Sequence, residues 1–141
     1  STNSLVTFVL LNILIMEKEL TRAEEQIMEF LWDLGEAFVK DIIEKMPEPK
    51  PAYTTVSTII RILEKKGIVA HKAYGNTHSY YPLLSREQYT ENCANNLVKR
   101  HFDNSLSNLV SFFTSKKNLS ISELEEIQQL INDEVKKQKK S

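Results

Sequence analysis

The segment from residue 54 to residue 65 carries the side chains whose types and spacing point most clearly to chemistry. Its apolar residues recur at helical spacing and would form one narrow stripe: Val56, Ile59, Ile60 and Leu63. Hydroxyl and cationic residues lie off that stripe: Thr54, Thr55, Ser57, Thr58, Arg61 and Lys65. Small hydroxyl residues are poor helix formers, but they pack close to base edges, form hydrogen bonds and present methyl groups to thymine. The pattern favours a helix that enters the major groove of DNA, with a capped, solvent-exposed helix as the alternative.

A second group of polar side chains follows in a segment with the pattern of a β-hairpin. Two runs suited to strands, residues 68–72 and 78–83, flank a turn-rich stretch between them. Cationic and hydrogen-bonding groups lie in and beside that turn: Lys72, Tyr74, Asn76 and His78. On a hairpin beside a DNA-reading helix, such groups would contact the sugar-phosphate backbone or the minor groove. Taken singly, each of these residues is most simply an ordinary polar loop residue. Taken together with the helix over residues 54–65, they predict one continuous basic surface.

Charges of opposite sign are sorted into neighbouring segments, although the formal net charge of the 141 residues is only −1. Residues 20–48 are predominantly acidic. Between Lys50 and Tyr80 the single acidic residue is Glu64, against five lysine and arginine residues. Because DNA binding depends on local potential rather than on net charge, the basic segment is where a DNA surface is expected.

The elements that would position these groups are mainly helical, because the chain has only 3 Gly and 4 Pro. Thr21 and Glu24 form a capping-box pattern that opens a helix, and Gly35 is a suitable stop. The predicted order is helix, helix, turn, helix and hairpin, over about residues 21–35, 38–46, 53–66 and 68–83. This order predicts a winged helix-turn-helix over residues 20–84, in a protein that is mainly α with a small β-hairpin wing.

Residues 85–141 are predicted to form a helical arm that joins two copies of the chain. Helices are expected from the capping box of Ser85 and Gln88 to about residue 102, over about 104–115, and from Ser120 onward. The arm contains more apolar side chains than a small head can cover: Leu106, Leu109, Val110, Phe112, Phe113, Leu124, Ile127, Leu130 and Ile131. We therefore predict a two-fold homodimer, which would match a palindromic operator. An arm folded back on its own head is the alternative.

Four stretches carry a resemblance to a known family: TRAEEQIMEFLW at residues 21–32, TVSTIIRILEKKG at 55–67, YYP at 80–82 and LSISELEEI at 119–127. They resemble the penicillinase-repressor (BlaI/MecI/CopY) family, in register from about residue 20 to the C-terminus. The resemblance implies a dimeric repressor with a winged-helix head, whose base-reading positions fall on Thr54, Thr55, Ser57 and Thr58. It also implies a membrane sensor-protease system whose action leads to cleavage of the repressor within the arm.

The sequence departs from the pattern of that family in three places. Ile62 stands where members commonly have Arg, so that the phosphate contact passes to Arg61 or is lost. The Asn-Phe bond that is cut in the beta-lactamase repressors aligns near Ser111-Phe112, where the Asn is missing, so the resemblance does not by itself assign control by proteolysis to this chain. The C-terminal cysteine cluster of the copper-responsive branch is absent, which excludes copper sensing by that route.

Catalysis finds little support in the sequence. His71, His78 and His101 show no metal-ligand spacing, and there is no Gly-rich phosphate loop or nucleophile elbow, so no enzyme, metal or cofactor is predicted. The single Cys93 excludes an internal disulfide and fits a reducing cytoplasm. The second function that we consider is a winged helix that binds a partner protein and no DNA. The overall acidity favours this alternative slightly.

Residues 1–19 form an apolar N-terminal extension to which the sequence assigns no role. The apolar run from Leu5 to Ile15 is too short to span a bilayer, and it lacks the flanks of a signal peptide. We therefore predict no membrane insertion, a cytoplasmic location and an extension that is ordered by packing on another surface.

Overall fold

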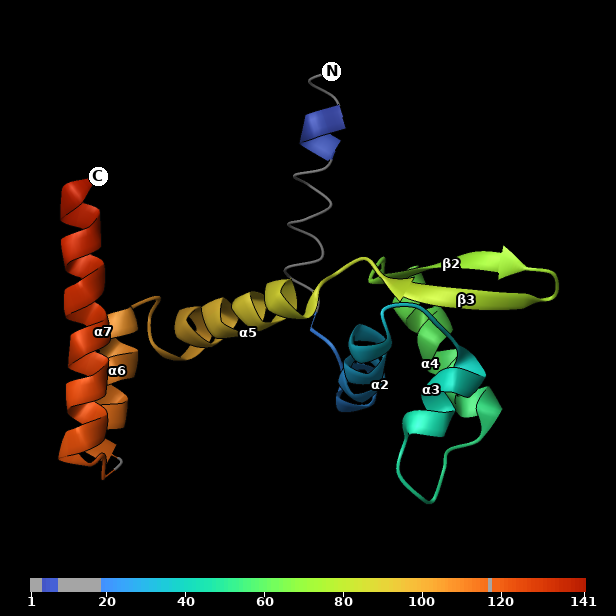
Figure 1. Cartoon of the computed structure of the whole chain (residues 1–141), viewed down its shortest axis with the longest axis horizontal. Coiled ribbons are helices and arrows are strands. Elements are labelled where there is room, and N and C mark those ends of the chain that lie inside the picture. Colours follow the sequence, from blue (N-terminus) through green and yellow to red (C-terminus); the bar gives the residue numbers. More distant parts are fainter. Residues whose placement is uncertain (1–3, 8–18, 117) are drawn as a thin grey trace. The chain divides into compact units, whose positions relative to one another are not determined.

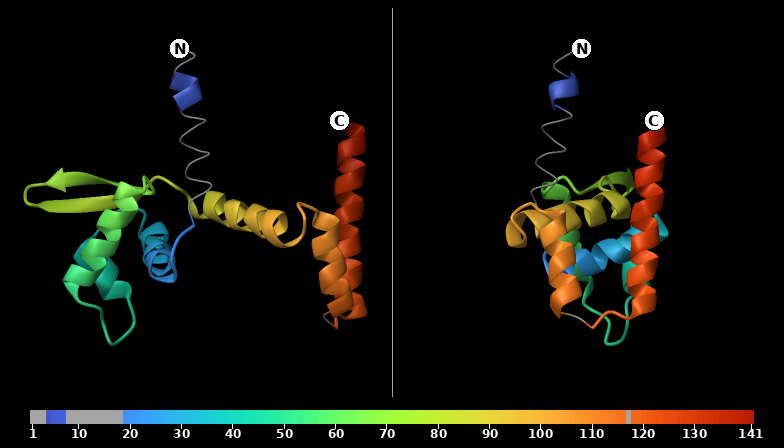
Figure 2. Two further views of the ribbon diagram at one scale, coloured as in Figure 1. Left: turned by 180° about the vertical axis from the view of Figure 1, so that it is seen from behind. Right: turned by 90° about the vertical axis from the view of Figure 1, so that its left-hand side faces the viewer.

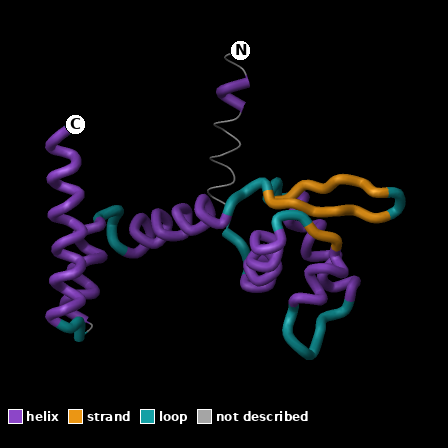
Figure 3. The backbone as a smooth tube through the Cα atoms, in the orientation of Figure 1, coloured by secondary structure: helices purple, strands orange, loops and turns teal. Residues whose placement is uncertain are grey.

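The structure, a computed structural model, describes residues 4–7, 19–116 and 118–141, and its contacts divide the chain into two compact units (Figure 1). The units are residues 1–93 and residues 94–141; here the head denotes residues 20–93 and the arm residues 94–141. The elements in chain order are α2 (Arg22–Leu34), β1 (Ala37–Phe38), α3 (Val39–Lys45), α4 (Tyr53–Lys65), β2 (Val69–Tyr74), β3 (Thr77–Pro82), α5 (Arg86–His101), α6 (Leu106–Lys116) and α7 (Ile121–Lys140). The described chain is thus mainly helical, and its strands lie in the head (Figure 3).

Helix α2 begins and ends at the residues that the sequence predicts. The backbone N–H of Glu24 donates to the Thr21 hydroxyl at 3.2 Å, and the Thr21 N–H donates to the Glu24 carboxylate at 2.9 Å. At the other end, the Gly35 N–H donates to the Leu31 carbonyl at 2.8 Å, with φ at +80°. Glycine adopts this conformation without steric cost. The capping box and the glycine stop are therefore confirmed.

The sheet has three antiparallel strands in the order β1-β3-β2. In the hairpin, Tyr74 is opposite Thr77, so the turn contains only Gly75 and Asn76, with Gly75 at φ +62°. A glycine at the first central position is typical of a type II′ turn, whose twist suits a hairpin. Strand β1, which pairs Phe38 with Ser79, was not predicted. Two residues are too few for an alternating pattern to be visible in the sequence.

Helices α2, α3 and α4 pack against one another and against the sheet around a single core. The buried apolar residues are Ile27, Met28, Leu31, Ala37, Val39, Ile42, Val56, Ile60, Leu63, Ile68, Val69, Tyr80 and Leu84. The turn end of the hairpin projects beyond these helices (Figures 1 and 2). The head thus presents one helix, α4, and one projecting hairpin, both held by a common core.

The first turns of α5 belong to the head. Ser85 and Gln88 form the predicted capping box, with hydrogen bonds of 3.0 and 3.1 Å. Arg86 then donates to Asp33 of α2 at 2.7 Å, and the Tyr89 hydroxyl donates to Glu25 at 2.6 Å. The contacts therefore divide the chain after Cys93, later than the expected boundary at residue 84. The capping pattern locates the start of this helix, but the contacts of its side chains depend on the tertiary structure.

The arm consists of the end of α5 together with α6 and α7, which lie side by side (Figures 1 and 2). Its last helix begins at the predicted cap, where the Glu123 N–H donates to the Ser120 hydroxyl at 3.1 Å. None of the described residues after Cys93 is buried. Among the helices of the described residues, none is long and apolar enough to cross a membrane.

The N-terminal extension is described only at residues 4–7 and 19. Residues 4–7 form a helical turn in which Leu5 and Val6 are exposed. Most of the apolar run, and with it the prediction that this run packs on another surface, lies outside the described residues.

Candidate nucleic-acid interface

The exposed side of α4 presents most of the hydroxyl residues that the sequence singles out. Val56, Ile60 and Leu63 are buried in the head, and Ile59 is partly buried against the same core. The opposite side of the helix is exposed, and its residues are Thr54, Thr55, Thr58, Arg61, Ile62 and Lys65. Within the head, therefore, no other element covers the side of α4 that was predicted to face DNA.

Ser57 is the exception, and the structure corrects its predicted orientation. The residue is only 7% exposed, so its hydroxyl does not lie on the outer side of α4. Ser57 precedes the buried Ile60 by three positions, and residues at this spacing share a helix face. The four-residue apolar stripe drawn from the sequence was too narrow, because a small polar residue at its edge is also buried.

The hydroxyl of Thr58 is used within the helix. Its Oγ1 donates to the carbonyl of Thr54 at 2.7 Å, the bond that serine and threonine often make one turn back. The hydroxyl proton is therefore occupied, while the oxygen can still accept, and Thr58 as a whole residue is exposed. Thr58 thus presents an acceptor and a methyl group, and no donor, to a ligand.

One face of the hairpin forms a cluster with α4. The rings of His71 and His78 stack with centroids 4.0 Å apart, and His71 Nδ1 bonds to the carboxylate of Glu64 on α4. Tyr80, opposite His71 in the register, adjoins both imidazoles. Burial raises the pKa of Tyr80 and Glu64 adds to this rise, while the nearby Arg61 guanidinium opposes it. Arg61 thus lies against the Tyr80 hydroxyl, at the junction of α4 and the hairpin.

The other face of the hairpin carries Lys72 and Tyr74. The Lys72 ammonium lies 3.1 Å from the Glu36 carboxylate, and this hydrogen bond raises the pKa of Lys72. The Tyr74 ring meets Phe38 edge to face at 5.8 Å. Since Lys72 pairs with Ser79 and His78 with Ala73, Lys72 and His78 point to opposite faces of the hairpin. The predicted continuous basic surface is therefore divided between two faces.

Most cations of the basic segment already have partners within the head. Lys50 donates to the carbonyls of Ile43, Glu44 and Met46 at 2.9 to 3.1 Å and so caps the C-terminus of α3. Lys66 donates to both carboxylate oxygens of the buried Glu24, at 2.7 and 2.8 Å. Lys65 has no ion-pair partner among the residues that the structure describes. The charge count of this segment therefore overstates the positive charge that the head offers to a ligand.

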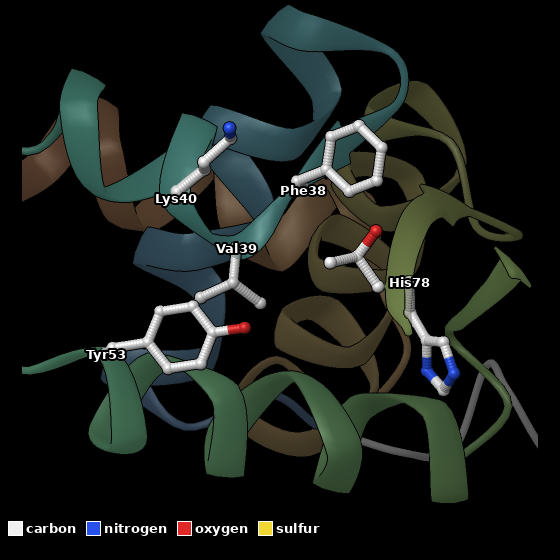
Figure 4. Close-up of a pocket in the computed structure, with 6 residues that line it drawn as sticks. Phe38, Val39, Lys40, Tyr53 and His78 are labelled. Carbon is white, nitrogen blue, oxygen red and sulfur yellow. The ribbon is translucent and has the colours of Figure 1, made fainter. Parts of the chain in front are cut away.

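A hollow of about 240 Å³ lies beside the start of α4 and shows two residues that the sequence did not suggest (Figure 4). It is lined by Phe38, Val39, Lys40, Tyr53, Thr77 and His78. Lys40 and Tyr53 were missed because they lie on different helices, and only the tertiary structure brings them near His78. Their exposure on helices next to the hairpin could be inferred from the sequence, but their proximity could not.

The nine apolar residues predicted to form the contact between two copies lie on α6 and α7, and α7 carries two more. Seven of the nine predicted contact residues are exposed, at 39–67%: Leu106, Val110, Phe112, Leu124, Ile127, Leu130 and Ile131. Leu109 and Phe113 are partly buried. Ile121 and Val135, which are 75% and 45% exposed, extend the row on α7. They follow the same helical spacing as the predicted residues, so the sequence pattern identifies them as well.

The Ser111-Phe112 bond lies inside helix α6. The Ser111 carbonyl accepts hydrogen bonds from the hydroxyls of Thr114 and Ser115, at 3.1 and 2.8 Å. The Phe112 ring contacts Phe102 and Phe113 edge to face. The bond is thus near the surface but in a helical conformation. As for metals, the described residues contain no cluster of three or more histidine, cysteine or acidic residues suited to an ion.

Three helices around one core, an exposed third helix and a three-stranded sheet with a projecting hairpin define the head as a winged helix-turn-helix. The sequence model of the penicillinase repressor family matches residues 20–133, and the chain belongs to this family. Its members are repressors of transcription and not enzymes.

Two curated relatives illustrate this relationship. The methicillin resistance regulatory protein MecI of Staphylococcus aureus (strain N315) is 28% identical over 115 residues, which are 81% of this chain and 94% of that protein. The penicillinase repressor of Bacillus licheniformis is 22% identical over 122 residues, 86% of this chain and 95% of that protein.

The crystal structure of the adhesin competence repressor AdcR of Streptococcus pyogenes covers 96% of this chain, and the chain covers 93% of it. Its TM-score of 0.41 and 16% identity are too low to add to the assignment.

Proposed function

We propose that this chain is a sequence-specific DNA-binding repressor that acts as a homodimer on a palindromic operator in the cytoplasm. The observation that carries the proposal is the open outer side of α4, where Thr54, Thr55 and Thr58 are exposed beside Lys65. In helix-turn-helix proteins, the second helix of the motif lies in the major groove with its N-terminal residues at the base edges. Base reading is thus assigned first to the opening turns of α4, where Thr54, Thr55 and Thr58 lie.

The exposed cations would supply the contacts to phosphate. Arg61 and Lys65 lie further along α4, and Lys40 lies beside the start of α4 with Tyr53 and His78. Phosphate contacts of this kind fix the register of a protein on the duplex without reading its sequence. At the end of the hairpin, Tyr74 and Asn76 would reach the backbone or the minor groove.

To bind a phosphate, Lys72 would have to leave its ion pair with Glu36. Both side chains of the Lys72–Glu36 pair are more than a third exposed, and exposed ion pairs contribute little to stability. A phosphate can therefore replace Glu36 at small cost. We expect Lys72 to contribute less to DNA affinity than Lys65, whose ammonium has no carboxylate to give up among the described residues.

The arm would supply the two-fold symmetry of the repressor. Leu124, Ile127, Ile131 and Val135 form one exposed row on α7. Covering this row with the same row of a second copy removes it from water and pairs two heads. A dimer of this kind binds two half-sites about 34–36 Å apart, or a multiple of that distance, on one side of the duplex.

Relief of repression by cleavage at Ser111-Phe112 is the part of the proposal that depends on the arm. A cut there separates α7 from the head, and with it most of the exposed apolar row. Because the bond lies within α6, this helix must open before a protease that binds extended chain can act. Mass spectrometry of the repressor from induced cells should then detect a fragment that ends at Ser111.

The test of the proposed function is a selection of bound duplexes from a random library, followed by affinity measurements at 50 and 200 mM salt. Affinity for the selected duplex should fall about 10³-fold or more over this range if the dimer contacts six or more phosphates. Thr55→Ala should reduce the preference for the selected duplex over random DNA. Lys65→Ala should weaken binding to the selected duplex and to random DNA about equally. It should also reduce the steepness of log affinity against log salt concentration by about 1 per subunit.

Lys136→Ala on the arm is the matched control, since it removes a cation that is remote in sequence from the head. A chain that binds no duplex at 50 mM salt is not a repressor of this kind, and a partner-binding winged helix then becomes the better explanation. The assignment of roles on α4 fails if Thr55→Ala and Lys65→Ala have the same effect on selected and random DNA.

A further inference from the structure

The exposed side of α4 consists of two rows of different chemistry. Arg61 and Lys65 follow Thr54 at helical spacing, seven and eleven residues further along, and form a polar row with it. Beside it lie Thr55, Thr58 and Ile62, at positions i, i+3 and i+7, which share a helix face. Ile62 is 44% exposed, whereas the next residue, Leu63, is fully buried. The second row therefore ends in an apolar side chain on the outer surface of the proposed base-reading helix.

The second row offers methyl groups more than hydrogen-bond donors. The Thr58 hydroxyl donates to the Thr54 carbonyl at 2.7 Å, so that its proton is not available to a base. Ile62 has no polar group, and Thr55 carries a methyl group of its own. A single exposed apolar residue on a protein surface needs no explanation. Here, however, the residue continues a row of methyl groups on the side that would face the bases.

The major groove has one apolar feature that such a row can recognise. The C5-methyl group of thymine projects into the groove, while the other base edges there present hydrogen-bond donors and acceptors. Burying a methyl group between protein and DNA removes apolar surface from water. A row of side-chain methyl groups therefore favours thymine over cytosine at the positions that it contacts.

We propose that Ile62 is a specificity-determining residue that reads thymine through its methyl group, together with the methyl groups of Thr55 and Thr58. This inference rests on the proposed function, because it requires α4 to lie in the major groove. Its consequence is that each operator half-site contains at least one thymine whose C5-methyl group contributes to the affinity. Arg61 and Lys65, on the neighbouring row, remain phosphate contacts.

The experiment replaces thymine with uracil in the duplex that the selection yields. Uracil pairs as thymine does and lacks only the methyl group. Each duplex carries uracil at one thymine position of the half-site, replaced in both half-sites at once, and the positions are tested one after another. Affinity is measured by fluorescence anisotropy. At the position read by Ile62, the affinity of the native protein should fall about 4-fold per half-site, or about 16-fold in all. This is the effect expected when one buried methyl group is removed from each half-site.

Ile62→Ala should lose most of this discrimination at that position, and it should bind the uracil duplex nearly as well as the native protein does. Lys65→Ala is the matched control: it should weaken binding to the thymine and uracil duplexes by the same factor, so that their ratio is unchanged. Because Ile62 is exposed, the variant should fold, and the fluorescence of Trp32 in the head checks this.

The outcomes separate the inference from the proposed function. If no duplex is selected, the proposed function fails and the inference fails with it. If a duplex is selected but uracil is tolerated at every half-site thymine, the inference is wrong while the repressor function stands. The inference is equally wrong if Ile62→Ala keeps the full thymine-to-uracil ratio of the native protein at every position.

Discussion

The head and the arm cover their apolar side chains in different ways. In the head, residues from α2, α3, α4 and the sheet are buried against one another, and Met28, Leu31, Ile42, Ile60 and Leu63 are completely inaccessible. In the arm, none of the described residues is buried, and the apolar residues of α7 face solvent. The same helical periodicity therefore encodes an internal core in one region and an uncovered row in the other.

This difference indicates how the two regions divide the work of a repressor. The head has the core that a domain needs to hold α4 and the hairpin in fixed positions. None of the described residues of the arm is buried, and helices in water depend on packing of an apolar face for most of their stability. In the proposed homodimer, covering the row with a second copy would therefore supply much of the stability of the arm.

The largest effect is expected from a charge placed in the apolar row of the arm. Ile131→Lys introduces an ammonium group into each copy of the proposed seam, and burial of an unpaired charge is costly. We expect the dimer dissociation constant to rise by about 1,000-fold, equivalent to about 4 kcal/mol. Analytical ultracentrifugation measures this directly.

Gln129→Lys is the control for this substitution, because it adds the same charge two residues away on the polar side of α7. Gln129 is exposed and donates to Asp133 at 2.8 Å, and a lysine can pair with the same carboxylate. The dimer should be unaffected. Equal weakening by both substitutions would show that charge alone, rather than the apolar row, governs association.

The next largest effect should appear in the core of the head, where two neighbouring residues of α4 differ in exposure. Leu63→Ala creates a cavity at a fully buried position and should lower the free energy of unfolding by about 3 kcal/mol. Ile62→Ala, at an exposed position, should change it by less than about 0.5 kcal/mol. Urea unfolding monitored by the single tryptophan, Trp32, reports on the head alone. Equal losses would mean that α4 is not packed through Leu63.

A smaller effect, dependent on pH, is expected from the buried carboxylate that joins α2 to the end of α4. Burial alone would raise the pKa of Glu24, but hydrogen bonds from Lys66 and Thr21 outweigh it and hold the pKa below its ordinary value. The charged carboxylate therefore stabilises the head above about pH 4.3, and this contribution is lost as the pH falls through the lowered pKa. At pH 7, Glu24→Gln should cost about 1–3 kcal/mol.

The cost of Glu24→Gln should shrink as the pH falls from about 4.3 toward 2. Urea unfolding at a series of pH values measures the difference from the native protein. Glu44→Gln, at an exposed carboxylate, is the control and should cost less than about 0.5 kcal/mol at every pH. A difference for Glu24→Gln that does not change with pH would show that its charge is not stabilising.

The smallest effect tests where the head ends. The Tyr89 hydroxyl donates to Glu25 of α2, and the Tyr89 ring lies 5.5 Å from that of Trp32. Tyr89→Phe removes the hydrogen bond and keeps the ring, so it should cost about 0.5–1.5 kcal/mol. Hydrogen exchange should accelerate at residues 87–93 and remain unchanged at residues 94–101. Uniform acceleration along α5 would place the whole helix in one unit.

The local features of this fold could be predicted because they depend on neighbours in the sequence. The capping residues Thr21, Ser85 and Ser120 begin their helices as expected, since the groups that they bond to lie three residues away. The apolar spacing of α4 likewise places Leu63 inside, because helical periodicity assigns each residue to a face. Ser57 shows the limit of this rule at the edge of a stripe.

The sequence by itself determined the order of the helices, the hairpin and the exposure of most of the proposed DNA-reading residues, since short-range spacing encodes each of them. Only the tertiary structure decided which cations remain open. Lys66 meets Glu24 from 42 residues away, and Lys72 meets Glu36 across the fold. It also added strand β1 and brought Lys40 and Tyr53 to the hollow beside the hairpin. These pairings depend on how the chain packs, and no local pattern of residue types specifies which distant charges will meet.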